Sequence, residues 1–169
     1  MLDPSACGRL RQHIGSAMTF AEESGEASAV VISQGEQMAR PGVGRAVALG
    51  WQTREEFGLF RSEMAQGSEV AAHFHRTFSE SFYLLWGRME LWNGDAWRGV
   101  SPGDRAYIPP GGVHGLRITE GPAEVLTLFV PGIPRERFVL ELMEIRQSGR
   151  QLAPKEWAEF YRRHDQYMV

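Results

Sequence analysis

Short apolar runs alternate with turn-forming residues along most of the chain, and this pattern is typical of a β-rich protein. Glycine and proline separate the runs, as they do in sandwiches and barrels of short strands. The predicted strands cover residues 45–51, 56–64, 69–75, 81–86, 88–92, 96–100, 105–108, 113–119 and 123–130. A shorter β-rich piece over residues 29–33 is predicted to precede them. The pattern therefore predicts an all-β barrel or sandwich.

Turn sequences support these boundaries. Asn93-Gly94 lies between two predicted strands and favours a tight hairpin, because glycine adopts positive φ without steric cost. Segments 101–104 and 109–112 combine proline with glycine and are predicted as turns.

The spacing of apolar positions becomes helical in the last part of the chain. Residues 135–147 place Phe138, Leu142 and Ile145 at helical spacing. A second helix is predicted from Pro154, because proline is well tolerated in a first turn. We therefore expect three parts: an N-terminal extension (1–28), a β barrel (29–131) and a helical tail (132–169) that packs on the barrel or on a partner subunit.

Composition narrows the class of protein. The chain has 169 residues, 43% of them hydrophobic and 23% charged, as in a soluble globular domain. Its formal net charge of −3 gives no general attraction to nucleic acid or to an anionic membrane. We find no signal peptide and no apolar segment long enough to span a bilayer, and the single cysteine, Cys7, excludes an internal disulfide. We expect a cytoplasmic protein with neither nucleic-acid nor membrane partners.

Residues 67–87, GSEVAAHFHRTFSESFYLLWG, carry polar groups that an ordinary strand does not need. His73 and His75 are two positions apart and so point to the same side of a strand. Glu80 begins the next predicted strand and can point back toward them. His114 follows a turn rich in proline and glycine and can supply a fourth ligand. This donor set predicts a site for one divalent transition metal, with Fe, Mn, Ni, Co, Cu and Zn all compatible.

The same residues resemble the two motifs of the cupin family. The first motif, G-x5-H-x-H-x4-E-x6-G, is filled by Gly67, His73, His75, Glu80 and Gly87. The second, G-x5-P-x-G-x2-H-x3-N, is filled by Gly103, Pro109, Gly111 and His114, with Ile118 in place of the usual asparagine. That asparagine is not a metal ligand in the family, so the departure leaves the predicted ligand set intact. The resemblance implies a jelly-roll (double-stranded β-helix) barrel with the metal inside, followed here by C-terminal α-helices.

A single barrel with such a tail is similar to the bacterial quercetin-dioxygenase-like cupins. This resemblance implies metal-dependent insertion of dioxygen into flavonol-like enols, with Glu80 as both metal ligand and general base. Three alternatives stay open. They are a dioxygenase acting on a small enolisable aromatic, flavonol- or polyketide-like compound, a non-redox cyclase, isomerase or decarboxylase of secondary metabolism, and a non-catalytic small-molecule-binding cupin.

Strand alternation from Glu80 and His114 predicts the wall of the substrate pocket. The residues at every second position after Glu80 and after His114 are expected to point inward, and they are Phe82, Leu84, Trp86, Leu116 and Ile118. This wall is apolar, partly aromatic and without an evident inward arginine cluster. It favours a small aromatic substrate over a sugar phosphate or a dicarboxylate, although any barrel core contains inward aromatic residues.

Tryptophans at three positions can contribute to pairing through sheet edges, namely Trp51, Trp92 and Trp97. We therefore expect a homodimer.

Overall fold

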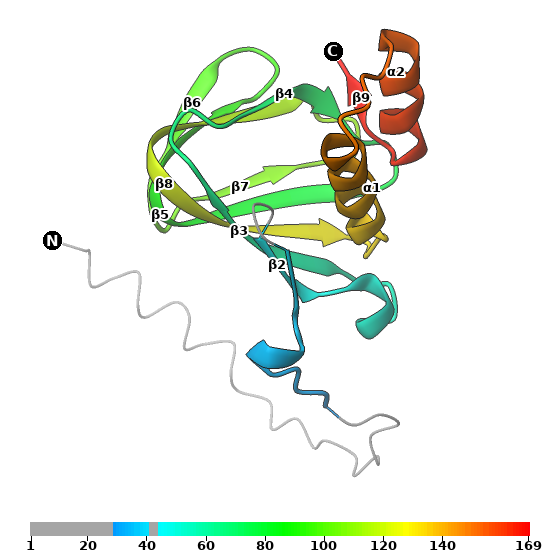
Figure 1. Ribbon diagram of the computed structural model, residues 1–169. Coiled ribbons are helices and arrows are strands. Elements are labelled where there is room, and N and C mark those ends of the chain that lie inside the picture. The colour runs from blue at the N-terminus through cyan, green and yellow to red at the C-terminus, as the bar shows by residue number, and fades with distance from the viewer. Residues whose placement is uncertain (1–28, 41–43) are drawn as a thin grey trace, which may run out of the picture. The chain divides into compact units, whose positions relative to one another are not determined.

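The computed structural model describes residues 29–40 and 44–169 (Figure 1). The chain divides into two units, Met1–Val31 and Ile32–Val169, and the architecture below is that of the second. The N-terminal extension predicted over residues 1–28 lies outside the described residues.

One antiparallel sheet contains all the strands of the described residues. The strands are β1 (Met38–Arg40), β2 (Gly44–Ala48), β3 (Gly58–Met64), β4 (Glu69–Phe74), β5 (Ser79–Trp92), β6 (Trp97–Val100), β7 (Arg105–Ile108), β8 (His114–Val130) and β9 (Tyr167–Met168). Short 3-10 helices cover Gln34–Glu36 and Gly50–Gln52. The predicted all-β class is confirmed, but the sheet does not close into a barrel by hydrogen bonding, because β6 and β7 pair only with β5.

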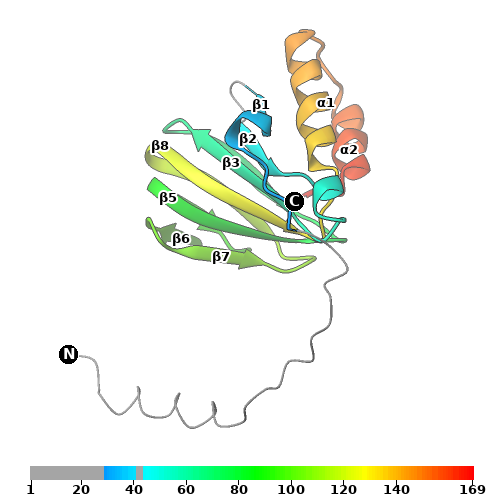
Figure 2. The same cartoon turned by 90° about the horizontal axis from the view of Figure 1, so that it is seen from below.

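The two long strands β5 and β8 form the centre of the sheet and lie side by side in both views (Figures 1 and 2). The other edge of β8 is shared, since its first part pairs with β4 and its second part with β3. Each long strand was expected as two shorter ones. Register shifts between Leu84 and Met89 let β5 bend around Gly87 without ending, because bulges absorb a change of direction within a strand.

The predicted β-rich piece over residues 29–33 is wrong. These residues form no strand, and Val30 and Val31 are 78% and 90% exposed. A strand needs a neighbouring edge, and β propensity without one does not produce it. The first strand is instead β1, which pairs with β2.

Apolar side chains on one face of β5 and β8 form the core, together with side chains from β6 and β7. Its buried members are Phe82, Leu84, Met89, Leu91, Val100, Ile108, Leu116, Ile118, Ala123 and Val125. Within each half of β5 and of β8 their spacing follows the two-residue period of a strand, and the period shifts between Leu84 and Met89 and between Ile118 and Ala123. The same face carries the polar residues of the candidate site.

Both predicted helices are confirmed, as α1 (Arg135–Gln147) and α2 (Pro154–Arg163). They pack on each other through Phe138 and Phe160, whose ring centroids are 5.5 Å apart. After α2 the chain turns back as β9, which pairs with β4 at His73 and Phe74. The C-terminal residues therefore lie beside the strand that carries the histidines (Figure 1). Among the described residues, no helix has the length and apolar character needed to cross a membrane.

Candidate metal centre

Four buried side chains converge in the interior of the β region. They are His73, His75, Glu80 and His114, and one ligand atom from each lies within 4.8 Å of the others. Glu80 Oε2 lies 2.9 Å from His114 Nε2 and 3.4 Å from His75 Nε2. The four residues predicted as ligands are therefore brought together and form a potential site for a metal ion.

Strand pairing explains why the four residues meet. His73 of β4 lies opposite His114 of β8 in the ladder, and opposite residues point to the same face of a sheet. His75 follows directly after β4, and Glu80 lies near the start of β5. The backbone N–H of Gly111 donates to the His75 carbonyl over 2.6 Å. This bond ties the turn before His114 to the histidine pair.

Each imidazole is oriented by a backbone carbonyl. The Nδ1 atoms of His73, His75 and His114 lie 2.8, 2.6 and 3.0 Å from the carbonyl oxygens of Ala71, Asp165 and Gly112, respectively. A carbonyl oxygen only accepts, so each Nδ1 carries a hydrogen, and the Nε2 of each ring points toward the centre.

The donor set fits a divalent transition metal. Among the described residues, the buried His75 Nε2 has no hydrogen-bond partner, and an unpaired buried polar atom costs free energy. Three imidazole nitrogens and a carboxylate suit metals of the Fe-to-Zn series. An ion at this point would engage the His75 atom that the protein leaves without a partner.

The charges of the group are compatible with metal binding. Burial favours the neutral form of Glu80, but the hydrogen bond with His114 and the nearby His75 outweigh it and hold the pKa of Glu80 well below its usual range. Burial, followed by the neighbouring His114, lowers the pKa of His73 to about 4. For His114, the lowering effect of burial is outweighed by the hydrogen bond to Glu80, so its pKa is raised. Metals bind an ionised carboxylate and neutral imidazoles, so metal binding would release the proton that joins His114 Nε2 to Glu80.

The C-terminal segment supports the centre through Asp165, a residue that the sequence does not indicate. Its carbonyl accepts from His75, and its carboxylate accepts from the backbone N–H groups of Arg76 and Thr77 and from the Thr77 hydroxyl at 2.6–3.1 Å. Asp165 thus fixes both the ring of His75 and the turn that follows it. No local pattern reveals this contact, because 90 positions separate the two residues.

A second residue that the sequence does not indicate is Arg135, the first residue of α1. Its guanidinium lies 5.6 Å from the ring centroid of Phe129, and the charge of Glu80 acts on it.

The predicted pocket residues divide into two groups. Phe82, Leu84, Leu116 and Ile118 are buried in the core, and the Phe82 ring centroid lies 6.1 Å from that of His114. Trp86 is 39% exposed, and its Nε1–H donates to Glu124 over 2.7 Å. The inward direction predicted for Trp86 is therefore wrong, because the register shift after Leu84 interrupts the alternation.

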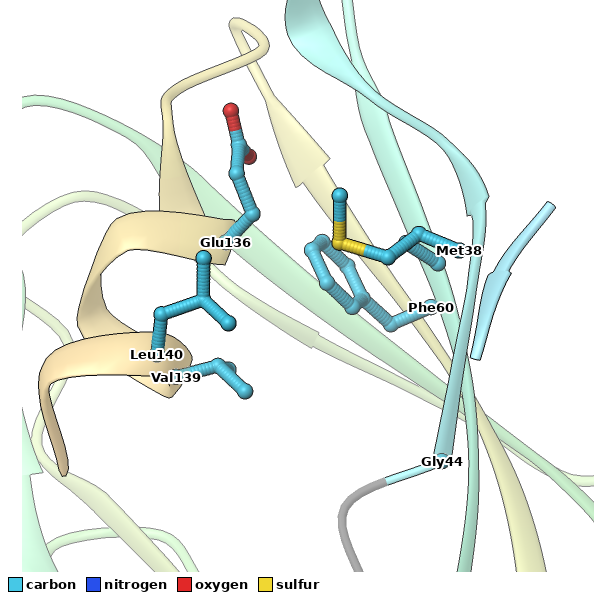
Figure 3. A pocket seen from close by; sticks show the side chains of 7 residues that line it. Met38, Gly44, Phe60, Glu136, Val139 and Leu140 are labelled. Carbon is cyan, nitrogen blue, oxygen red and sulfur yellow. The ribbon is translucent and has the colours of Figure 1, made fainter. Parts of the chain in front are cut away.

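A separate apolar pocket lies between α1 and the strands β1, β2 and β3 (Figure 3). Its lining residues are Met38, Gly44, Ala46, Phe60, Glu136, Val139 and Leu140. None of the four predicted ligands lines it, so it is distinct from the metal centre.

The fold and the site together define a β domain with a potential internal metal site of His and Glu residues, and comparison with known proteins shows what this domain is similar to. Residues 60–129 match the family described as the cupin domain, Cupin_2. The chain is 29% identical, over 117 residues and 69% of its length, to quercetin 2,3-dioxygenase of Bacillus subtilis strain 168. The match covers 33% of that protein, so the chain spans about a third of its length.

Solved structures are similar to the chain in fold. KdgF from Halomonas sp. superposes with a TM-score of 0.50 at 24% identity, covering 59% of this chain and 90% of that one. Oxalate decarboxylase of Bacillus subtilis, a protein with Mn(II) centres, gives a TM-score of 0.57 at 23% identity, covering 68% and 33%. The β region of the chain is thus similar to cupin domains in sequence over residues 60–129 and to these solved structures in fold.

Proposed function

We propose that the chain is a metal-dependent cupin enzyme, and that it is a dioxygenase acting on a small enolisable aromatic, flavonol- or polyketide-like compound. One observation carries the proposal: three Nε2 atoms, each oriented through its own Nδ1–H, converge with Glu80 in a buried space. A structural role for four buried polar groups would leave no reason for an unpaired His75 Nε2.

The ligands would be His73, His75, Glu80 and His114, and a metal there would supply Lewis acidity toward an anionic substrate oxygen and, for a redox-active ion, a partner for dioxygen. Glu80 would accept the proton of the substrate enol, because its carboxylate lies among the proposed ligand atoms, where that proton would be released. Phe82 would exclude water from that side of the site. In the overall reaction the O–O bond breaks and both oxygen atoms enter the substrate, so no external reductant is consumed.

The similarity to quercetin 2,3-dioxygenase supports this choice of reaction. The matched cupin region contains all four proposed ligands. The apolar residues beside the ligands agree with an aromatic substrate.

The experiment combines elemental analysis with oxygen uptake. Protein purified without added metal would be analysed by inductively coupled plasma mass spectrometry and then assayed in an oxygen electrode with quercetin and related enols. We expect about one metal per chain and consumption of one dioxygen per substrate, with both atoms of 18O2 recovered in the product. Full turnover without oxygen in zinc-loaded protein would instead indicate the cyclase, isomerase or decarboxylase. Tight ligand binding without turnover would indicate a binding protein.

We further propose a cytoplasmic homodimer, in which Trp51, 72% exposed, contributes to the interface. Trp92 and Trp97 are partly buried, with ring centroids 5.7 Å apart, and Trp97 lies under Arg117. These two side chains therefore offer less exposed surface to a second subunit than the sequence alone predicts. Light scattering coupled to size exclusion gives the mass in solution, and a monomer at all concentrations would contradict the dimer.

A further inference from the structure

Arg135 is placed where its charge is poorly stabilised. It is the first residue of α1, and a cation at a helix N-terminus opposes the positive end of the helix dipole. Its Nη2 donates to Gln166 Oε1 over 3.0 Å, but its Nη1 is buried and has no hydrogen-bond partner among the described residues. A buried donor without a hydrogen-bond partner on a charged group costs free energy, and an acceptor atom of a ligand would remove that cost.

The surroundings of Arg135 place it close to the metal centre. Its guanidinium lies 5.6 Å from the ring centroid of Phe129, and Phe129 lies directly opposite Glu80 in the pairing of β5 with β8. Phe78 completes the connection, with its ring 5.5 Å from that of Phe129 and stacked at 4.2 Å on His75. The Arg135 guanidinium therefore packs against the aromatic rings that surround the ligands, and its charge interacts with those of Glu80 and His114.

Among the described residues, no acid forms an ion pair with Arg135. Glu80 and Asp165 are the acids whose charge acts on it. Glu80 is bonded to His114, and the Asp165 carboxylate is occupied by the backbone of Arg76 and Thr77. Burial lowers the pKa of Arg135 to about 10, so it stays protonated at neutral pH. The site thus holds a cation with a free, oriented donor.

We propose that Arg135 is the anion-binding residue of this centre, and that its Nη1 donates to a carboxylate or enolate oxygen of the substrate. The inference rests on the proposed metal-dependent function and adds a requirement to it, namely that the substrate carries a negative charge. The apolar wall expected from the sequence is therefore incomplete. Gln166 holds the guanidinium in orientation through the bond to Nη2.

A structural role makes the opposite prediction for stability. The Arg135 guanidinium lies 3.9 Å above the Phe138 ring centroid, so it also contributes packing. If packing were its purpose, Arg135→Met would lower the melting temperature and leave anion binding unchanged. If anion binding is its purpose, Arg135→Met removes a buried unpaired charge and keeps or raises the melting temperature, since such replacements are often neutral or stabilising.

The test uses full-length protein loaded with Mn²⁺, with benzoate and its neutral isostere benzamide as probes in titration calorimetry. We expect wild type to bind benzoate more tightly than benzamide, and Arg135→Met to lose about 10- to 100-fold in benzoate affinity, the effect of a charge-assisted hydrogen bond. Metal content and benzamide affinity should not change. Arg137→Gln, at an exposed position of the same helix, is the matched control and should behave as wild type.

The ratio of benzoate to benzamide affinity decides the outcome. An unchanged ratio in metal-loaded Arg135→Met, or no preference for benzoate in wild type, overturns the role of Arg135 alone. A wild-type protein that takes up no metal overturns the proposed function and this inference together. If Arg135→Met does not fold, Arg135→Gln is measured in its place, and an unchanged ratio there overturns the role equally.

Discussion

The backbone carbonyls behind the three imidazoles determine which nitrogen of each ring faces a metal. Ala71, Gly112 and Asp165 each accept an Nδ1–H, so the Nε2 atoms are directed inward by the protein itself. Such outer partners fix the tautomer and the ring orientation of metal-binding histidines. The site is therefore organised by its own protein groups.

The first prediction concerns His75. His75→Ala removes a ligand whose Nε2 is unpaired in the protein, so metal affinity should fall by more than the roughly 10- to 100-fold typical of outer partners. Metal content after dialysis against a buffered ion series measures the loss. Glu69→Gln, at an exposed position on β4, is the control and should retain full metal content. Equal metal content in His75→Ala and wild type would disprove the ligand assignment.

The sequence predicts the four ligands but not the residues that support them. His73, His75 and Glu80 lie within one short segment, and their spacing alone puts the two histidines on one side of a strand. Asp165 and Arg135 lie on the helical tail. Their places depend on how that tail returns to β4, and tertiary contacts of this kind leave no periodic pattern in the chain.

At the scale of elements, the bend of β5 depends on Gly87. Its φ is +85°, and a Cβ built there would lie 2.6 Å from Ala123. Local patterns predict a strand end at such a glycine, and the structure instead shows a continuous strand that bends. In β8, Gly121-Pro122 lies between the two predicted strands, and the structure again shows one continuous strand.

Gly87→Ala should destabilise the protein by about 2–5 kcal/mol, the sum of left-handed backbone strain and overpacking. Urea unfolding followed by tryptophan fluorescence gives the free energy of unfolding. Gly99→Ala in β6 is the matched control, because its Cβ meets nothing within 4 Å, and it should be within about 0.5 kcal/mol of wild type. Equal losses in the two variants would contradict the steric explanation.

The segment that follows α2 is the element that joins the tail to the centre. Asp165→Ala removes the carboxylate that holds the turn at Arg76 and Thr77, so the carbonyl that orients His75 loses its fixed position. Metal affinity should fall about 10-fold, at the lower end for an outer partner. Competition with a fluorescent chelator measures it, and Asp95→Ala in the exposed 93–96 turn serves as the control. A wild-type affinity in Asp165→Ala would show that the tail does not support the site.

For the molecule as a whole, metal binding and stability should be coupled. Metal-free protein keeps buried imidazoles around one carboxylate, with His75 Nε2 unpaired. A metal at 100 times its dissociation constant would stabilise the folded state by about 2.7 kcal/mol, because it binds the folded chain and not the unfolded one. At about 2–4 °C per kcal/mol for a chain of this size, the melting temperature should rise by about 5–11 °C over protein treated with EDTA. Scanning calorimetry measures both states, and His75→Ala should lose most of the difference.

Identical melting temperatures with Mn²⁺, with Zn²⁺ and with EDTA would mean that the four buried residues hold no ion, and the cluster would then have to be explained by polar packing alone.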